Sequence, residues 1–247
     1  MNNPCELQAV LVGSDPAVID SIIQCLEQLG IVGAVYAQAA FAVETLARQK
    51  VDALFVDGEF DPELSVLKGM RSSRSSRGAV GFAIVARQKS VTEASRVADF
   101  VMDKPLAPLS VNRAVRAAYG IMLKERKRYF RHSLRVPVDL TDATYRKFIG
   151  HTINLSQSGI ALECAAPVAG ADTVQLGFEL PGSGDKLNCK AQIIWTADQG
   201  KIGLTFTQMK SADKERLTAW LEQEFHRLWD MPDAKSPAVA SVPARRQ

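Results

Sequence analysis

The first 120 residues alternate short apolar runs with stretches of helical periodicity. The run at 8–12 reads QAVLV, and Asp15 and Pro16 then supply an N-cap and a first-turn proline for a helix over 18–29. The unit recurs, with strands predicted at 32–36, 53–56, 80–85 and 100–102 and helices around 41–47, 64–70, 91–97 and from 109 onward. Five strands alternating with five helices predict a doubly wound parallel sheet covered on both faces.

From Val136 the pattern changes to short stretches of strand-like alternation separated by turn signals. Strands are predicted at 136–141, 148–155, 159–164, 173–180, 187–197 and 201–209, with hairpin turns at 181–185 and 198–200. Six such strands predict a small antiparallel β-barrel. A final helix, capped by Ser211, carries one apolar face for packing over the barrel or against another subunit: Leu217, Trp220, Leu221, Phe225 and Leu228.

These patterns predict a two-domain protein. An α/β domain occupies 1–120, a basic helix and linker 121–135, and a barrel domain with its C-terminal helix 136–230. The remaining residues, 231–247, are rich in Pro, Ala and Ser and are expected to form a disordered tail.

Composition narrows the class of protein. The chain has 247 residues, of which 47% are apolar, so a substantial core is available, and its net charge of +3 is too small to indicate a nucleic-acid binder by bulk electrostatics. Its four cysteines are scattered without a CxxC pair, which argues against a zinc site and a disulfide framework. Neither a signal peptide nor an apolar run of about 18 residues is evident, so we expect a cytoplasmic protein without a membrane span.

Two charged residues follow strands of the first domain, at the edge where ligands bind in such sheets. Asp57 ends the third strand in DALFVDGEF, and Lys104 follows the fifth in FVMDKPL. Their order and spacing resemble the receiver domain of response regulators over about residues 6–120. The resemblance implies that Asp57 is the phosphoacceptor position and that Lys104 contacts the phosphoryl group.

The sequence departs from the receiver pattern at two places. Gly13 and Ser14 stand where acidic residues would help to hold Mg²⁺, and Ala86 stands where a Ser or Thr is expected. We therefore expect a pseudo-receiver with a vestigial phosphoacceptor site and no bound metal, acting in dimerisation or in docking of an unidentified protein partner. The alternative keeps Asp57 as a phosphorylation site.

A dense basic stretch leads into the second domain. Lys124, Arg126, Lys127, Arg128, Arg131 and Arg135 lie within twelve residues. The turn between the second and third barrel strands reads NLSQSG, from Asn154 to Gly159. This pair of features resembles the PilZ domain, whose signature is an arginine-rich RxxxR segment followed by [D/N]xSxxG, and the match spans about residues 124–229.

The resemblance implies that the domain binds cyclic di-GMP, and the residues suit that ligand. An arginine can bond phosphate oxygens bidentately, bond the O6 and N7 atoms of guanine, or stack on a purine. Asn154 and Ser156 would offer polar contacts to a guanine edge, and Gly159 would permit a tight turn or a close backbone approach.

The arginine motif can be aligned in two registers. One uses Arg131 and Arg135 as an intact RxxxR. The other uses Lys127, Arg128 and Arg131, which keeps a more typical separation from Asn154, and we prefer it. In that register Arg135 is auxiliary, and Lys127 cannot fork or stack as an arginine would, so Arg126 could substitute for it.

Other conspicuous residues have simpler interpretations. The basic segment RSSRSSRG at 71–78 contains no aromatic residue and is interpreted as a solvated turn. His132, His151 and His226 lack partners at metal-ligand spacing and indicate surface or packing roles. Trp195, Trp220 and Trp229 are interpreted as core or helix-packing residues.

The sequence thus predicts a cyclic di-GMP effector that uses no cofactor and relays binding to a partner through movement between its domains. It is not expected to be an enzyme, because no nucleophile–base pair, metal cluster or phosphate-binding glycine loop is evident. One alternative is a PilZ-like adaptor that has lost ligand binding. Another is a nucleic-acid-binding regulator that uses the basic stretch with Tyr129 and Phe130 for stacking, although no nucleic-acid partner is expected.

Overall fold

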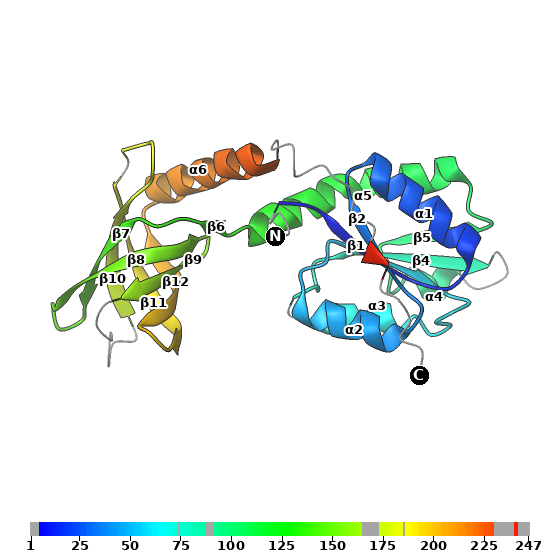
Figure 1. Cartoon of the computed structure of the whole chain (residues 1–247), viewed down its shortest axis with the longest axis horizontal. Coiled ribbons are helices and arrows are strands. Elements are labelled where there is room, and N and C mark those ends of the chain that lie inside the picture. The colour runs from blue at the N-terminus through cyan, green and yellow to red at the C-terminus, as the bar shows by residue number, and fades with distance from the viewer. Residues whose placement is uncertain are drawn as a thin grey trace. The chain divides into compact units, whose positions relative to one another are not determined.

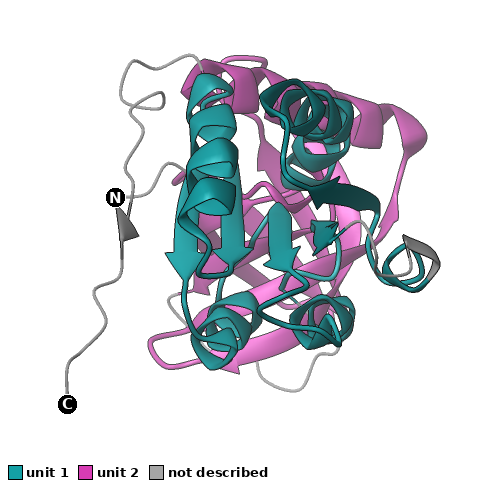
Figure 2. Ribbon diagram, turned by 90° about the vertical axis from the view of Figure 1, so that its right-hand side faces the viewer, with its two compact units in different colours: residues 1–127, 231–247 teal, residues 128–230 magenta. Residues whose placement is uncertain are grey.

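The chain folds into two compact units (Figure 2). The computed structural model describes residues 5–73, 75–86, 91–164, 173–184, 186–229 and 240–241. The first unit comprises Met1–Lys127 and Met231–Gln247, and the second comprises Arg128–Asp230. The boundary at Lys127 therefore lies inside the segment 121–135 that the sequence indicates as a linker.

The first unit is the predicted doubly wound α/β domain. Its elements are β1 (Gln8–Val12), α1 (Pro16–Gln28), β2 (Val32–Tyr36), α2 (Ala39–Arg48), β3 (Ala53–Asp57), α3 (Ser65–Ser72), β4 (Val80–Ala86), α4 (Val91–Ala94), β5 (Phe100–Lys104) and α5 (Pro108–Tyr129). These strands are parallel in the order β2-β1-β3-β4-β5. Helices α1 and α5 cover one face and α2 and α3 the other (Figure 1).

The sheet is apolar on both faces because helices cover both. Every residue of β3 is buried, and Phe82 of β4 stacks on Phe55 with ring centroids 4.3 Å apart. At the start of α1 the predicted cap is confirmed, since Asp15 Oδ1 accepts the N–H of Ala17 at 3.0 Å. The four cysteines are all buried, as expected of small apolar side chains.

The basic segment at 71–78 is not simply a solvated turn. Ser76 is fully buried, and its hydroxyl donates to the carbonyls of Leu46 and Gln49 at 3.0 and 2.9 Å. Ser73 adds a hydroxyl bond to the Leu46 carbonyl at 2.8 Å. These carbonyls belong to the C-terminal end of α2 and its following residue, so serines of the segment satisfy acceptors that the helix leaves unpaired.

The chain beyond 229 lies outside the described residues except for Ala240–Ser241. These two residues form the short strand β13, which pairs in parallel with Ala34 and Val35 of β2. The expected disordered tail is otherwise not described.

The second unit is the predicted six-stranded antiparallel barrel. Its elements are β6 (His132–Ser133), β7 (Pro137–Asp142), β8 (Lys147–Leu155), β9 (Gly159–Cys164), β10 (Thr173–Glu179), β11 (Lys186–Ala197), β12 (Lys201–Met209) and α6 (Ser211–Trp229). The order β8-β7-β10-β11-β12-β9 closes because β9 also pairs with β8. The two-residue strand β6 was not predicted.

Helix α6 packs against the start of this unit through aromatic rings. Phe225 meets Phe130 edge-to-face at 5.2 Å, and Trp220 meets His132 edge-to-face at 5.3 Å. The Nε1 atom of Trp220 donates to the carbonyl of Pro181 at 3.0 Å. The predicted cap of this helix was wrong by one residue: the carbonyl of Lys210 accepts the N–H of Lys214, so Ser211 is already inside the first turn.

Candidate functional site

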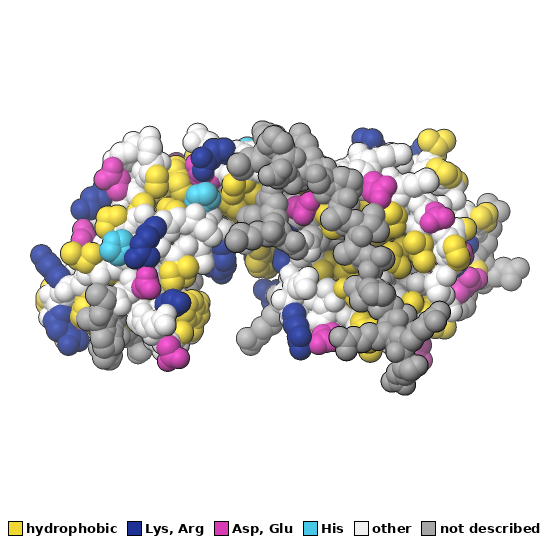
Figure 3. All heavy atoms as spheres, viewed as in Figure 1, with side chains coloured by type: hydrophobic (Ala, Val, Ile, Leu, Met, Phe, Trp, Pro, Cys, Tyr) yellow, Lys and Arg dark blue, Asp and Glu magenta, His cyan; other side chains and the backbone are white. Residues whose placement is uncertain are grey.

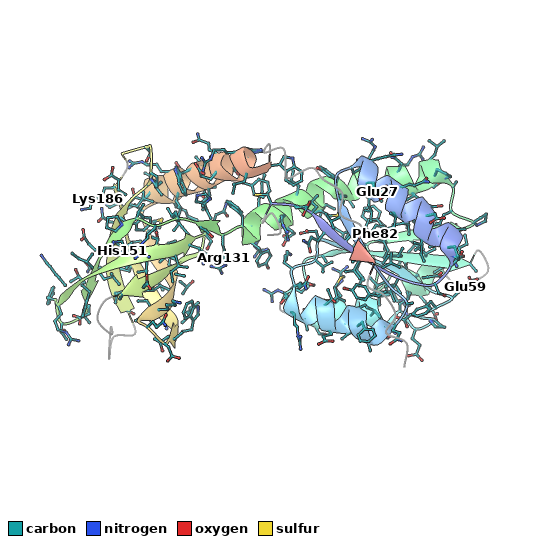
Figure 4. All side chains as sticks on the ribbon, in the orientation of Figure 1. Glu27, Glu59, Phe82, Arg131, His151 and Lys186 are labelled. Carbon is teal, nitrogen blue, oxygen red and sulfur yellow. The ribbon has the colours of Figure 1, made fainter. Side chains whose placement is uncertain are left out.

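The structure brings the basic stretch to the asparagine turn through β6. In the antiparallel pairing of β6 with β8, His132 lies opposite Leu155 and Ser133 opposite Asn154. The buried Thr152 extends this attachment, because its hydroxyl donates to the Leu134 carbonyl at 2.7 Å and accepts the Val136 N–H at 2.8 Å. Arg131 lies in the segment that joins α5 to β6 (Figure 4). The pairing therefore places it beside the asparagine turn, although the two are far apart in the sequence.

The turn from Asn154 to Gly159 is closed by its own serine. Ser156 is 3% exposed, and both its backbone N–H and its hydroxyl donate to the Gly159 carbonyl, at 2.9 and 3.0 Å. The Ser156 side chain thus holds the turn in shape. Gly159 is buried, and a Cβ atom there would overlap the backbone carbonyl of Leu204 on β12. The glycine is needed for close approach of two strands.

A hollow of about 320 Å³ lies beside this turn. We call it the barrel hollow; its lining includes Arg131, Asn154, Ser158, the start of β9, Ile194 and Trp195 of β11, and residues 203–205 of β12. The arginine-bearing segment and the asparagine turn therefore share one concave surface.

Asn154, one of the residues that line this hollow, carries an unsatisfied polar atom. Its Oδ1 is buried and has no hydrogen-bond partner among the described residues. A buried amide oxygen without a hydrogen-bond partner raises the free energy of the folded protein. A ligand group that donates a hydrogen bond to this oxygen would recover that free energy. Arg131 supplies an exposed cation to the same surface.

The β11 strand adds an aromatic side chain that the sequence assigned to the core. The β11–β12 register shifts between Ile193 and Trp195, which is a β-bulge at Ile194. Ile194 and Trp195 are therefore both exposed, to 59% and 44%, and both line the barrel hollow. The interpretation of Trp195 as a core residue was wrong, whereas Trp220 is buried and Trp229 stacks on Phe225 as predicted. The consecutive isoleucines that interrupt the alternation before Trp195 were the available signal.

The other basic residues are not equivalent. Arg126 is buried in the first unit, where its guanidinium donates to the Glu6 carbonyl and lies 3.4 Å from Asp52 Oδ2. It is therefore committed there and cannot substitute for Lys127. Arg135 binds Glu163 at 2.9 Å, which lowers the pKa of that carboxyl. Lys127 is the last residue of the first unit, and Arg128 is the exposed first residue of the second.

In the first unit, Asp57 and Lys104 meet as predicted. Lys104 Nζ donates to Asp57 at 2.8 Å, to Glu59 at 2.6 Å and to Asp15 at 3.3 Å. Desolvation lowers the pKa of Lys104, but bonds to the three carboxylates outweigh it and raise the pKa well above its usual range. Glu59 is a third carboxylate that the sequence analysis missed.

The three carboxylates have the oxygen chemistry that Mg²⁺ prefers, with atoms within 4.8 Å of one another. The lysine ammonium already donates to all three of them, however, so a dication would have to share or displace this internal cation. Ala86 ends β4 without a hydroxyl group, as the sequence shows.

The comparison with family models decides the nature of the second unit. Residues 125–223 match the PilZ domain. The match begins within α5, three residues before the second unit, and includes most of α6. No curated protein matches the chain.

Solved structures resemble each unit separately. The PilZ domain of CeSA from a cellulose-synthesizing bacterium is 21% identical, with a TM-score of 0.33, and the match covers 38% of this chain and 97% of that one. The inhibitor of motility MotI/DgrA of Bacillus subtilis is 16% identical with a TM-score of 0.35, covering 39% and 50%. The receiver domain of the sensor histidine kinase PA1611 of Pseudomonas aeruginosa PAO1 is 21% identical with a TM-score of 0.42, covering 47% and 98%.

Within the described ranges, no helix combines the length and apolar character needed to cross a bilayer.

Proposed function

We propose that this protein is a cyclic di-GMP effector whose PilZ domain binds the dinucleotide at the barrel hollow. The observation that carries the proposal is the meeting of Arg131 and Asn154 on one concave surface, because the two come from separate segments that β6 joins to β8. The Oδ1 of Asn154 is buried without a hydrogen-bond partner in the described part of the chain, so it is an acceptor that a ligand N–H group could satisfy.

Each side chain has a distinct role toward this ligand. The Arg131 guanidinium offers a fork to a phosphate or to a guanine edge, and Asn154 Oδ1 accepts from a guanine N–H group. Trp195 offers an exposed aromatic face for stacking. Ser156 and Gly159 act by shaping the turn, Lys127 and Arg128 add positive charge, and Arg135 is auxiliary.

Binding would be relayed through the junction of the units. Helix α5 continues to Tyr129, past the unit boundary after Lys127, and Arg131 follows it directly. Ligand capture by Arg128 and Arg131 would order this junction and change the angle between the units, which alters the surface offered to a protein partner. Small-angle scattering with and without cyclic di-GMP tests the relay; superimposable profiles would count against it.

In this account the receiver-like unit has no catalytic role and serves partner docking or dimerisation. The dense contact of Lys104 with Asp15, Asp57 and Glu59 favours this, because the acceptor carboxylate is already engaged. The protein would act in the cytoplasm without a cofactor.

Calorimetric titration of the whole protein separates the proposal from its rivals. We expect saturable binding of cyclic di-GMP and weak binding of a single-stranded oligonucleotide. An adaptor that has lost the ligand binds neither, and a nucleic-acid regulator binds the oligonucleotide with a steep salt dependence. Figure 3 argues against the nucleic-acid regulator, since Lys and Arg side chains over the barrel strands are interspersed with acidic ones on the face it shows.

A further inference from the structure

The indole of Trp195 lies directly on the backbone of Gly203. The two residues are opposite one another in the β11–β12 pairing, and both line the barrel hollow. A Cβ atom on Gly203 would overlap the ring, with the ring atom Cζ2 2.7 Å away and two further ring atoms closer still. The glycine therefore provides the space in which the indole rests.

The bulge and the glycine act together on the orientation of this ring. The bulge at Ile194 turns Trp195 out of the barrel interior, and the bare backbone of Gly203 lets the ring lie down on β12. With 44% of its surface exposed, the ring retains an accessible side at the hollow. An upright indole would instead project from the barrel, where it could not serve as one wall of the site.

We infer that Gly203 is a positioning residue for the ligand: by seating the Trp195 indole against β12, it presents the ring as a stacking platform for a purine base. The inference rests on the proposed function, in which Trp195 faces cyclic di-GMP. Gly203 itself has no side chain with which to bind the base, so its whole effect passes through the ring.

A purely structural alternative uses the same contact. An aromatic ring lying over a glycine of the neighbouring strand shields backbone and stabilises a sheet. That role predicts a lower melting temperature for Gly203→Ala with unchanged affinity for ligand. The two roles are therefore separable by measuring binding and stability on the same variants.

The test is a double-mutant cycle on the full chain, with cyclic di-GMP as the probe. Gly203→Ala should weaken binding on the order of ten- to a hundred-fold, as expected for a lost base-stacking contact. In a Trp195→Ala background the same substitution should cause no further loss. Gly177→Ala, on β10 outside the barrel hollow, is the matched control and should bind as wild type, because the nearest atom to its Cβ would be the Oδ1 at the end of the Asn188 side chain, at 3.2 Å.

A ligand-free measurement keeps the inference testable apart from the proposed function. Acrylamide quenching of Trp195 fluorescence, isolated by subtracting the matching Trp195→Phe protein, should increase in Gly203→Ala as the ring lifts from β12. Unchanged quenching would overturn the seating, and wild-type affinity in folded Gly203→Ala would overturn the platform. An equal loss in the Trp195→Ala background would show that Gly203 acts by another route. If wild-type protein fails to bind cyclic di-GMP, the proposed function and the platform both fail, and quenching still decides the seating.

Discussion

Ser133 lies opposite Asn154 in the pairing of β6 with β8, and this short pairing joins the end of the basic stretch to the asparagine turn. Arg131 comes two residues before Ser133, so the antiparallel register places it at the mouth of the asparagine turn. The hydroxyl of Thr152 holds the same segment further along, at the Leu134 carbonyl and the Val136 N–H. The meeting of arginine and asparagine is therefore a property of strand register.

The Arg135–Glu163 pair bears on which arginines bind the ligand. Arg135 is 65% exposed, and its contact with Glu163 is a surface ion pair, which contributes little to stability. We expect Arg135→Ala to leave the affinity for cyclic di-GMP within about threefold of wild type, a difference of about 0.7 kcal/mol. Calorimetry on Arg135→Ala and Glu163→Gln checks this. A loss for Arg135→Ala comparable to that for Arg131→Ala would instead support the register that uses both arginines.

The buried pair of Arg126 and Asp52 should dominate the stability of the end of α5. Burial raises the pKa of Asp52, whereas Arg126 and, less strongly, Lys50 lower it, so removing the guanidinium takes from a buried carboxyl the cation that acts on it most. Breaking a buried pair from one side costs about 3–5 kcal/mol. We expect Arg126→Ala to lower the free energy of unfolding of the first unit by an amount in this range.

Denaturant unfolding of the whole chain measures the Arg126 effect. Arg113→Ala, which removes an exposed arginine from the same helix, is the matched control. It should change the free energy of unfolding of the first unit by less than about 0.5 kcal/mol. Equal effects of the two substitutions would show that the buried pair has no special weight.

His132 should make the second unit sensitive to mild acid. Burial lowers the pKa of its imidazole from the usual 6.5, while Glu224, 3.6 Å from Nε2, raises it and Arg227 lowers it. Because the pKa of His132 is lower in the folded state, the unfolded chain binds the proton more readily. The contribution of the neutral imidazole to the stability of the second unit is therefore present above pH 6.5 and is lost as the pH falls below it.

Thermal unfolding between pH 7.5 and 5.5 tests the His132 prediction. The melting temperature of the second unit should fall over this interval in wild-type protein and much less in His132→Phe, which keeps the ring beside Trp220 but does not titrate. An identical decline in both proteins would assign the pH dependence to other groups.

Most elements of the fold followed from periodicity, because each strand and helix buries one side or both against a layer of the same unit. What failed were features set by partners distant in sequence. Arg126 looked like a possible substitute for Lys127 in the basic stretch until Asp52 was placed beside it. Alternation along β11 predicted that Trp195 faces the core. Alternation holds only while the strand register is regular, however, and the bulge at Ile194 reverses the sides of the residues after it.

The asparagine turn shows the same limit on a smaller scale. Its motif was recognisable, but the sequence could not tell whether the Ser156 hydroxyl faces a ligand or the Gly159 carbonyl. Glu59 was missed for a related reason, since only the folded loop after β3 brings it to Lys104.

The acid cluster of the first unit leads to a prediction about phosphorylation. Asp57 is held by Lys104, and the strand after it offers no hydroxyl for a phosphoryl-dependent switch. Intact-mass measurement after incubation with a small-molecule phosphodonor and Mg²⁺ should show no adduct. A stoichiometric phosphate, absent from Asp57→Asn, would establish an active receiver instead.

The most direct test of the account is calorimetric titration of Arg131→Ala with cyclic di-GMP, alongside wild type and the Arg135→Ala control. Truncating a guanidinium that bonds a phosphate or a guanine should cost about 2–4 kcal/mol, or roughly 30- to 700-fold in Kd. Binding by Arg131→Ala that matches wild type, in a protein with an unchanged circular dichroism spectrum, would contradict the claim that Arg131 and Asn154 converge on one ligand.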